Sequence, residues 1–91
     1  MQQTISIIVT GKVQGVFFRQ STKEKAIALG LTGKVMNQPD GTVQIVAAGS
    51  SESLDLLIAW CKQGPPKAIV KLVTVETVPL QVFEKFIIEQ V

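Results

Sequence analysis

The sequence predicts an α+β fold in which two helices cover one face of a mainly antiparallel sheet. Two segments carry apolar residues at helical spacing, and each is followed by a glycine. The other apolar segments are shorter, rich in β-branched residues and separated by turn-forming residues. In chain order they give a strand, a helix, two strands, a helix, a strand and a short final strand.

The first strand and the first helix are predicted from a change in the spacing of the apolar residues. Apolar residues alternate over Thr4–Thr10, which predicts a strand that ends at Gly11. Apolar residues then recur at helical spacing over Phe18–Leu29, and Gly30 suits the position just beyond a helix. The loop between them holds the glycines Gly11 and Gly15.

A hairpin is expected next. Thr32–Asn37 and Thr42–Ala48 have the composition of short strands, and the sequence NQPDG separates them. Pro39 fixes φ in that turn, and Gly41 tolerates a positive φ. The two strands are therefore expected to pair in an antiparallel hairpin with a longer loop.

The second helix is expected to begin at Ser50 or Ser51, either of which can cap it. Its apolar stripe comprises Leu54, Leu57, Ile58 and Cys61. Gly64 and the two prolines after it end the helix. The runs Ile69–Thr77 and Phe83–Ile88 predict the last two strands.

This order of elements is that of the split βαβ, ferredoxin-like sandwich. We expect a single domain over residues 1–91, because no linker, repeat or low-complexity segment interrupts the chain. The fold hosts enzymes, RNA binders and metabolite sensors, so function has to be argued from the site.

Composition excludes several kinds of chemistry. The 91 residues include no histidine and no tyrosine, which removes the usual general base and any Ser-His or Cys-His pair. A histidine and cysteine metal cage is also excluded. The net charge of +2 gives little reason to expect nucleic acid. The apolar runs are too short to span a membrane, no signal peptide is evident, and the single cysteine suits a reducing cytoplasm.

The loop before the first helix is the first candidate binding site. Arg19, the only arginine, stands in the first helical turn after the loop GKVQG. Helix N-termini bind anions through unpaired N–H groups, and arginine adds a forked, charged donor. The pattern suits a phosphate or a carboxylate and lacks the Lys-Ser/Thr pair of a nucleotide P-loop. The alternative is a tight turn followed by a solvated arginine.

Asn37, the only asparagine, is the second candidate. Its side chain both donates and accepts hydrogen bonds, so it can hold a water molecule, or it can serve the neighbouring turn instead. Phe17 and Phe18 suit either base stacking or the core, and we expect at least one in the core. Cys61 fits a small core residue, and Trp60 lies off the apolar stripe.

Taken together, three segments closely resemble the acylphosphatase family: GKVQGVFFR at 11–19, LGLTGKVMN at 29–37 and DGTVQIVAAG at 40–49. CKQGPPKAIVKLV at 61–73 and FIIEQV at 86–91 resemble the family's later part. The similarity covers essentially the whole chain, and the first two segments fix the spacing of a glycine loop, an arginine and an asparagine. The resemblance implies the same ferredoxin-like fold.

The resemblance also implies metal-free hydrolysis of acyl phosphates to a carboxylate and inorganic phosphate, without a cofactor. The family's catalytic arginine and asparagine fall on Arg19 and Asn37. Its phosphate cradle of backbone amides falls on Gln14, Gly15, Val16, Phe17, Phe18 and Arg19. We expect a cytoplasmic monomer whose partners are acyl phosphate and phosphate, with no nucleic acid and no membrane.

Two positions depart from the family's common pattern. Phe17 stands where glycine is frequent, and Lys34 stands where tryptophan is common. Neither replaces a chemical group, but Lys34 is placed to alter the rim of the site or the substrate preference. The rivals are an RNA binder, which lacks the expected aromatic residues on the strand at 42–48, and an anion sensor without turnover.

Overall fold

The computed structural model describes residues 2–90. Met1 and Val91 lie outside the described residues. They are the two ends of the expected domain, and Val91 is also the last residue of the segment at 86–91. The elements are β1 (Gln2–Lys12), α1 (Phe18–Ala28), β2 (Thr32–Asn37), β3 (Val43–Ser50), α2 (Ser51–Gln63), β4 (Ile69–Val78) and β5 (Phe86–Ile88). The predicted order of elements is confirmed.

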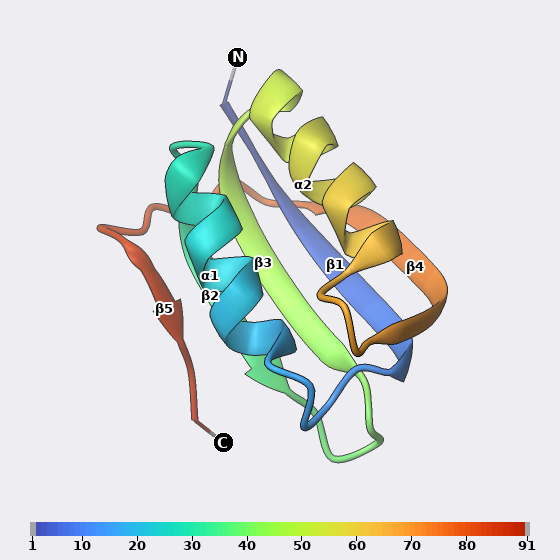
Figure 1. Cartoon of the computed structure of the whole chain (residues 1–91). Helices are drawn as coiled ribbons and strands as arrows, with labels where there is room; N and C mark the ends of the chain where they lie inside the picture. The colour runs from blue at the N-terminus through green and yellow to red at the C-terminus, as the bar shows by residue number, and fades with distance from the viewer. Residues whose placement is uncertain (1, 91) are drawn as a thin grey trace.

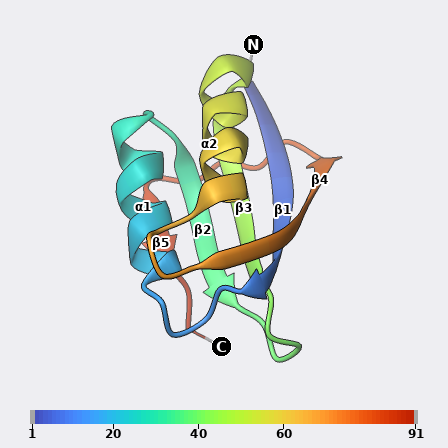
Figure 2. The same cartoon turned by 45° about the vertical axis from the view of Figure 1, so that its right-hand side comes forward.

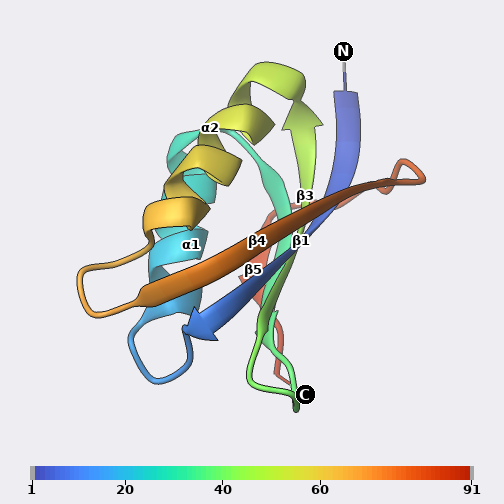
Figure 3. The ribbon, with the colours of Figure 1, turned by 90° about the vertical axis from the view of Figure 1, so that its right-hand side faces the viewer.

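The five strands form one sheet in the order β4-β1-β3-β2-β5. All neighbouring strands are antiparallel except β2 and β5, which pair in parallel. Both helices lie on the same face of this sheet, as the views in Figures 1 and 3 show. The predicted two-layer, mainly antiparallel ferredoxin-like sandwich is therefore confirmed.

The core lies between the helices and the sheet. Each helix turns one stripe inward: Phe18, Thr22 and Ala26 from α1, and Leu54, Leu57 and Cys61 from α2. Alternate residues of the central strands meet them, among them Ile7, Val9, Val35, Val43 and Ile45. The period of 3.6 in the helices and of 2 in the strands therefore places both apolar sets at one interface.

The first strand does not end at Gly11, contrary to the prediction. It continues to Lys12, and its register with β4 shifts between Thr10 and Gly11. Gly11 has φ 135°, and a side chain there would overlap the carbonyl oxygen of Ile69. The glycine thus forms an irregularity within a strand rather than a turn, since only glycine permits this close approach of two backbones.

The last strand is shorter than the predicted range Phe83–Ile88. Pairing begins at Phe86, opposite Gly33 of β2, and residues 79–85 form the connection from β4 across to the other edge of the sheet. Figure 2 shows this connection behind the central strands. Near its start, the Gln81 amide donates to the hydroxyl of Thr4 at 3.0 Å, which ties the connection to β1.

Candidate active site

Helix α1 begins without a side-chain cap. Phe17 occupies its N-cap position in a left-handed conformation, with φ 64° and ψ 24°. The first turn holds no acidic residue and contains Arg19. Phe18 is buried and packs against Trp60 with ring centroids 5.4 Å apart, which anchors the start of the helix. Phe18 confirms that one of the two phenylalanines belongs to the core, whereas Phe17 is 76% exposed.

The backbone amides of residues 14–19 donate to no backbone acceptor within residues 2–90. The Ser21 amide is the first to do so, donating to the Phe17 carbonyl oxygen at 3.0 Å. Unpaired N–H groups at a helix N-terminus carry partial positive charge and bind anions. The left-handed backbone at Gly15, with φ 73°, is typical of the turns in which successive amides point into one concavity.

A pocket of about 350 Å³ lies beside this helix start. It is lined by Val13, Gly15, Phe17, Phe18, Arg19, Gln20, Asn37, Ile88 and Gln90. The loop after β1, the β2–β3 hairpin and the segment after β5 lie at the same end of the molecule in Figure 1. The fold thus brings Arg19 and Asn37, which are 18 positions apart in the sequence, to one pocket.

Two of the predicted cradle residues, Gln14 and Val16, are not among the residues that line this pocket. Val16 is buried and belongs to the core. The Gln14 side chain is also directed elsewhere: its Nε2 donates to the carbonyl oxygens of Gln38 and Thr42, both at 2.9 Å. Both positions are predicted to act through their backbone amides, and that role stays a prediction.

The Gln14 contacts fasten the loop to the β2–β3 hairpin, a link that sequence reasoning missed. The acceptors lie 24 and 28 residues further along the chain. Both acceptors are backbone carbonyl oxygens, which every residue has. The residue types at these positions therefore give no sign of the contact. The link fixes the loop relative to the hairpin strand that ends in Asn37.

Asn37 has an unsatisfied oxygen. Its Oδ1 is buried and has no hydrogen-bond partner among residues 2–90. The hairpin turn is held instead by Asp40, whose carboxylate accepts from the Thr42 amide at 3.0 Å and from the Thr42 hydroxyl at 2.6 Å. These two bonds hold the pKa of Asp40 below its ordinary value. Since a buried acceptor without a partner is costly, the Asn37 oxygen is available to a ligand or a water molecule.

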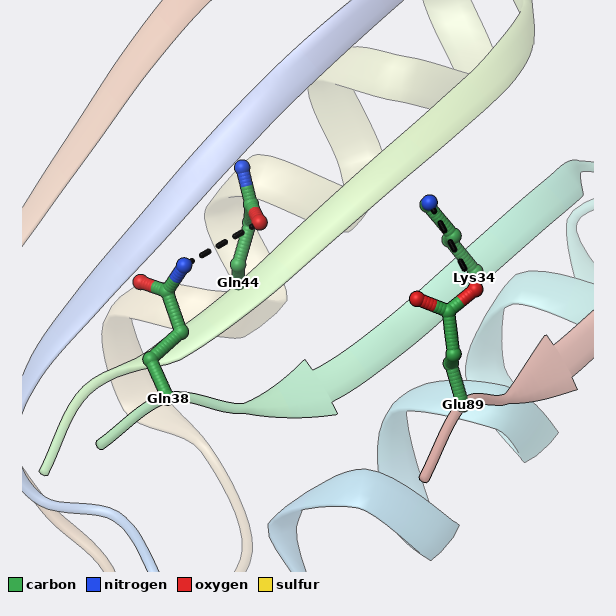
Figure 4. Close-up of polar contacts among 4 residues, drawn as sticks. All are labelled: Lys34, Gln38, Gln44 and Glu89. Carbon is green, nitrogen blue, oxygen red and sulfur yellow. Dashed lines mark hydrogen bonds and ion pairs between the residues drawn. The ribbon is translucent and has the colours of Figure 1, made fainter. Parts of the chain in front are cut away.

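Lys34 has an ion-pair partner, whereas Arg19 has none within residues 2–90. Within residues 2–90 the structure shows one ion pair, between Lys34 Nζ and Glu89 Oε2 at 3.5 Å, and it does not involve Arg19. Figure 4 shows this pair on the sheet face opposite the helices, where Gln38 also donates to Gln44 at 3.2 Å. Lys34 does not line the pocket, which corrects its predicted place at the rim.

The described residues offer neither a reactive thiol nor a cluster of metal ligands. Cys61 is buried in the core, and burial raises the pKa of its thiol to about 12. No cluster of three or more His, Cys, Asp or Glu side chains suited to a metal ion occurs in the described part of the chain. No helix over residues 2–90 is long and apolar enough to cross a membrane.

Comparisons with known proteins show the family of this chain. The acylphosphatase family model matches residues 5–88. An acylphosphatase of Xanthomonas euvesicatoria pv. vesicatoria is 54% identical over 72 residues, which cover 79% of this chain and 82% of that protein. Another, of Methylococcus capsulatus, is 54% identical over 66 residues and 72% of each chain.

Solved structures give the same result at the level of the whole fold. An acylphosphatase from Coxiella burnetii superposes with a TM-score of 0.94 at 41% identity, covering 97% of this chain and 93% of that one. The acylphosphatase of Bacillus subtilis superposes with a TM-score of 0.93 at 34% identity, covering 98% of this chain and 99% of that one. The chain therefore belongs to the acylphosphatase family.

Proposed function

We propose that this chain hydrolyses the carboxyl-phosphate bond of acyl phosphates, with the roles of its site residues set by the pocket at the start of α1. The observation that carries the proposal is the meeting of three features there. Backbone amides without backbone acceptors, the lone arginine and the buried, unsatisfied oxygen of Asn37 all belong to one end of the sandwich. Together they offer positive charge for phosphate and an acceptor for water.

The phosphoryl group is held at the positive end. We assign its binding to the backbone amides of residues 14–19 and to the Arg19 guanidinium, which forms charge-assisted bonds to phosphate oxygens. Phosphoryl transfer is catalysed chiefly by positioning and by neutralising charge on the transferred group. These donors stabilise that charge in the manner of an oxyanion hole.

Asn37 orients the nucleophile. Its Oδ1 accepts a hydrogen bond from a water molecule, which is thereby held in line with the bond to be broken. The water oxygen bonds to phosphorus, the bond from phosphorus to the acyl oxygen breaks, and its electron pair leaves on the carboxylate. A neutral amide is too weak to act as a base, so we assign the proton to a phosphate oxygen of the substrate itself.

The leaving group explains why no histidine is needed. A carboxylate has a pKa of about 4–5, like those of aspartate and glutamate side chains, and it departs without strong acid assistance. The hydrolysis therefore requires no imidazole, and we propose that it requires no metal and no cofactor. We further propose that residues 1–91 act as one domain and as a cytoplasmic monomer, which sedimentation equilibrium and cell fractionation would test.

Hydrolysis of benzoyl phosphate, followed with and without EDTA, tests this function. We expect turnover that EDTA does not change and that inorganic phosphate inhibits competitively. Activity lost to EDTA and restored by one divalent metal would contradict the mechanism. Binding of phosphate without any turnover would instead support the alternative of an anion sensor on the same fold.

A further inference from the structure

Residues 88–90 contribute one wall of the candidate active site. Ile88 and Gln90 line the pocket, whereas Glu89 between them pairs with Lys34 on the sheet face opposite the helices (Figure 4). This alternation is that of an extended strand, in which successive side chains point to opposite faces of the sheet. One side of the segment therefore belongs to the site, and the other side is held across the sheet.

Few backbone contacts hold this segment in place. Strand β5 is three residues long and lies at the edge of the sheet, with β2 as its one neighbour in the described part of the chain. Phe86 is buried and anchors its start. Beyond the strand, the Glu89 amide donates to the Val35 carbonyl oxygen at 2.9 Å, whereas the Gln90 amide donates to no backbone acceptor within residues 2–90. So short an edge strand is weakly held, and side-chain contacts therefore matter for the position of Gln90.

The ion pair between Lys34 and Glu89 is such a contact. Lys34 Nζ lies 3.5 Å from Glu89 Oε2. Lys34 belongs to β2, three positions before Asn37 at the end of that strand. The pair thus joins the segment that carries Gln90 to the strand that carries Asn37. Both charged side chains are partly exposed, so the pair is weak and sensitive to salt.

Gln90 suits a phosphate site without carrying a charge. Its carboxamide has two N–H donors and an acceptor oxygen. It lines the same pocket as Arg19 and Asn37. A donor at this place can bind a phosphate oxygen while Arg19 binds another, and it does so before any bond breaks. The contribution of Gln90 should therefore be seen in the affinity for the anion.

We propose that Lys34 is a positioning residue of the active site, which acts through Glu89 to hold Gln90 against the bound phosphate. This inference rests on the proposed function, in which the anion occupies this pocket. Lys34 does not line the pocket itself, so its effect passes through residues 88–90. Gln90 contacts the phosphoryl group in the ground state and in the transition state alike. Loss of the ion pair therefore weakens binding and leaves kcat unchanged.

The test measures phosphate binding by isothermal titration calorimetry and benzoyl phosphate hydrolysis in Lys34→Ala. We expect the dissociation constant of inorganic phosphate and KM to rise together by about 2- to 5-fold, the range of an exposed ion pair, with kcat unchanged. The ratio of variant to wild type should approach one in about 1 M salt, because the Debye length falls to about 3 Å.

Further variants separate the ion pair from the loss of a side chain. Lys34→Arg keeps a cation that pairs with a carboxylate and should retain the wild-type constants. Lys34→Glu should bind phosphate more weakly than Lys34→Ala, and adding Glu89→Lys to it should restore binding. Lys85→Ala is the control for net charge, because Lys85 is exposed, does not line the pocket and forms no ion pair within residues 2–90. It should leave both constants unchanged.

A double-mutant cycle tests whether Lys34 acts through Gln90. Gln90→Ala should raise the phosphate dissociation constant at least as much as Lys34→Ala does. In the Gln90→Ala background, Lys34→Ala should have little further effect, since the group that the ion pair positions is gone. A merely structural role of Lys34 would lower the denaturant midpoint equally in both backgrounds and would not move the phosphate affinity.

The outcomes distinguish this inference from the proposed function. Unchanged phosphate affinity in Lys34→Ala, additive effects of Lys34→Ala and Gln90→Ala, or a charge swap that restores nothing would overturn the inference while hydrolysis stands. A fall in kcat at unchanged phosphate affinity would overturn it as well. A wild type that binds phosphate without turnover would contradict the proposed function, and the dissociation constants would still test the role of Lys34.

Discussion

Helix α2 begins with a side-chain cap, and helix α1 begins without one. Ser50 has an extended backbone, and its hydroxyl accepts from the Ser53 amide at 3.2 Å. Glu52 adds a negative charge in the first turn of α2. At α1 the N-cap residue is Phe17, and no side chain within residues 2–90 caps the helix. Arg19 stands in the first turn.

The difference shows which helix start serves stability and which serves binding. A serine cap contributes about 0.5–2 kcal/mol, and an acidic residue in the first turn adds about 0.3–1 kcal/mol. Helix α2 obtains both contributions from its own chain. Helix α1 has neither contribution. It carries the positive charge of Arg19 near its positive end, an arrangement that is favourable only when an anion is bound there.

The largest expected effect is that of Arg19→Ala. Loss of a charge-assisted donor to the transition state should lower kcat/KM by about 10³-fold or more. The denaturant midpoint should not fall, because Arg19 has no ion-pair partner within residues 2–90 and opposes the helix dipole. Steady-state kinetics and urea unfolding measure both quantities.

Arg19→Lys is the matched control for charge alone. A lysine ammonium is a point charge without the planar fork, so it should restore little of the activity. Wild-type kcat/KM in the alanine variant would show that the open helix start works without its arginine.

Asn37→Ala is expected to lower kcat by about 10²- to 10³-fold, comparable to removal of one oxyanion-hole group. The inhibition constant for inorganic phosphate should change little, since the side chain orients water and carries no charge for the anion. Kinetics with phosphate as inhibitor, together with urea unfolding, give both values.

Asp40→Ala serves as the control in the same hairpin. It removes the bonds that hold the turn and should lower the denaturant midpoint without a change in kcat. If Asn37→Ala behaved in this way as well, Asn37 would be a turn residue and the water would lack its assigned partner.

Gln14→Ala should produce an intermediate effect, on the order of a tenfold decrease in kcat/KM, because the loop loses its attachment to the hairpin. Phosphate inhibition should weaken too, since the same loop holds the anion. Gln14→Glu should not restore activity, because a carboxylate cannot donate to the two carbonyl oxygens. Gln44→Ala, which alters hydrogen bonds on the opposite face, should leave kinetics unchanged.

The smallest effect on activity is expected at α2. Ser50→Ala should lower the free energy of unfolding by about 1 kcal/mol while kcat/KM per folded molecule stays at the wild-type value. Urea unfolding and the benzoyl phosphate assay on one preparation measure both. A large loss of activity in folded Ser50→Ala protein would contradict the conclusion that the start of α2 serves stability alone and the start of α1 serves binding.

Local sequence predicted most of the fold. The helical spacing over Phe18–Leu29 and the stop at Gly30 match α1, which ends at Ala28 with Gly30 at φ 74°. The serine cap of α2 and the glycine after it were equally local signals, and Ser50 and Gly64 occupy these positions. These features depend on residues within a few positions of each other, which is why sequence reasoning reached them.

The misses depend on pairing between distant segments. Local sequence predicts a strand end at Gly11, because the contact of Gly11 with Ile69 of β4 is not visible there. The start of β5 depends on its parallel register with β2, and the role of Gln14 depends on carbonyl groups in the hairpin. Sequence spacing and the family resemblance predicted Arg19 and Asn37, whereas the strained backbone of Phe17 was found only in the structure.

The central claim is that the uncapped start of α1 holds the phosphate, and a phosphate titration followed by ¹H-¹⁵N NMR tests it most directly. We predict that the backbone amides of residues 14–19 shift with one common, saturable dissociation constant and that Arg19→Ala weakens or abolishes these shifts. The amides of Ser51–Leu54 at the capped start of α2 should not respond. Saturable shifts confined to other parts of the chain, or equal responses at the two helix starts, would contradict the account.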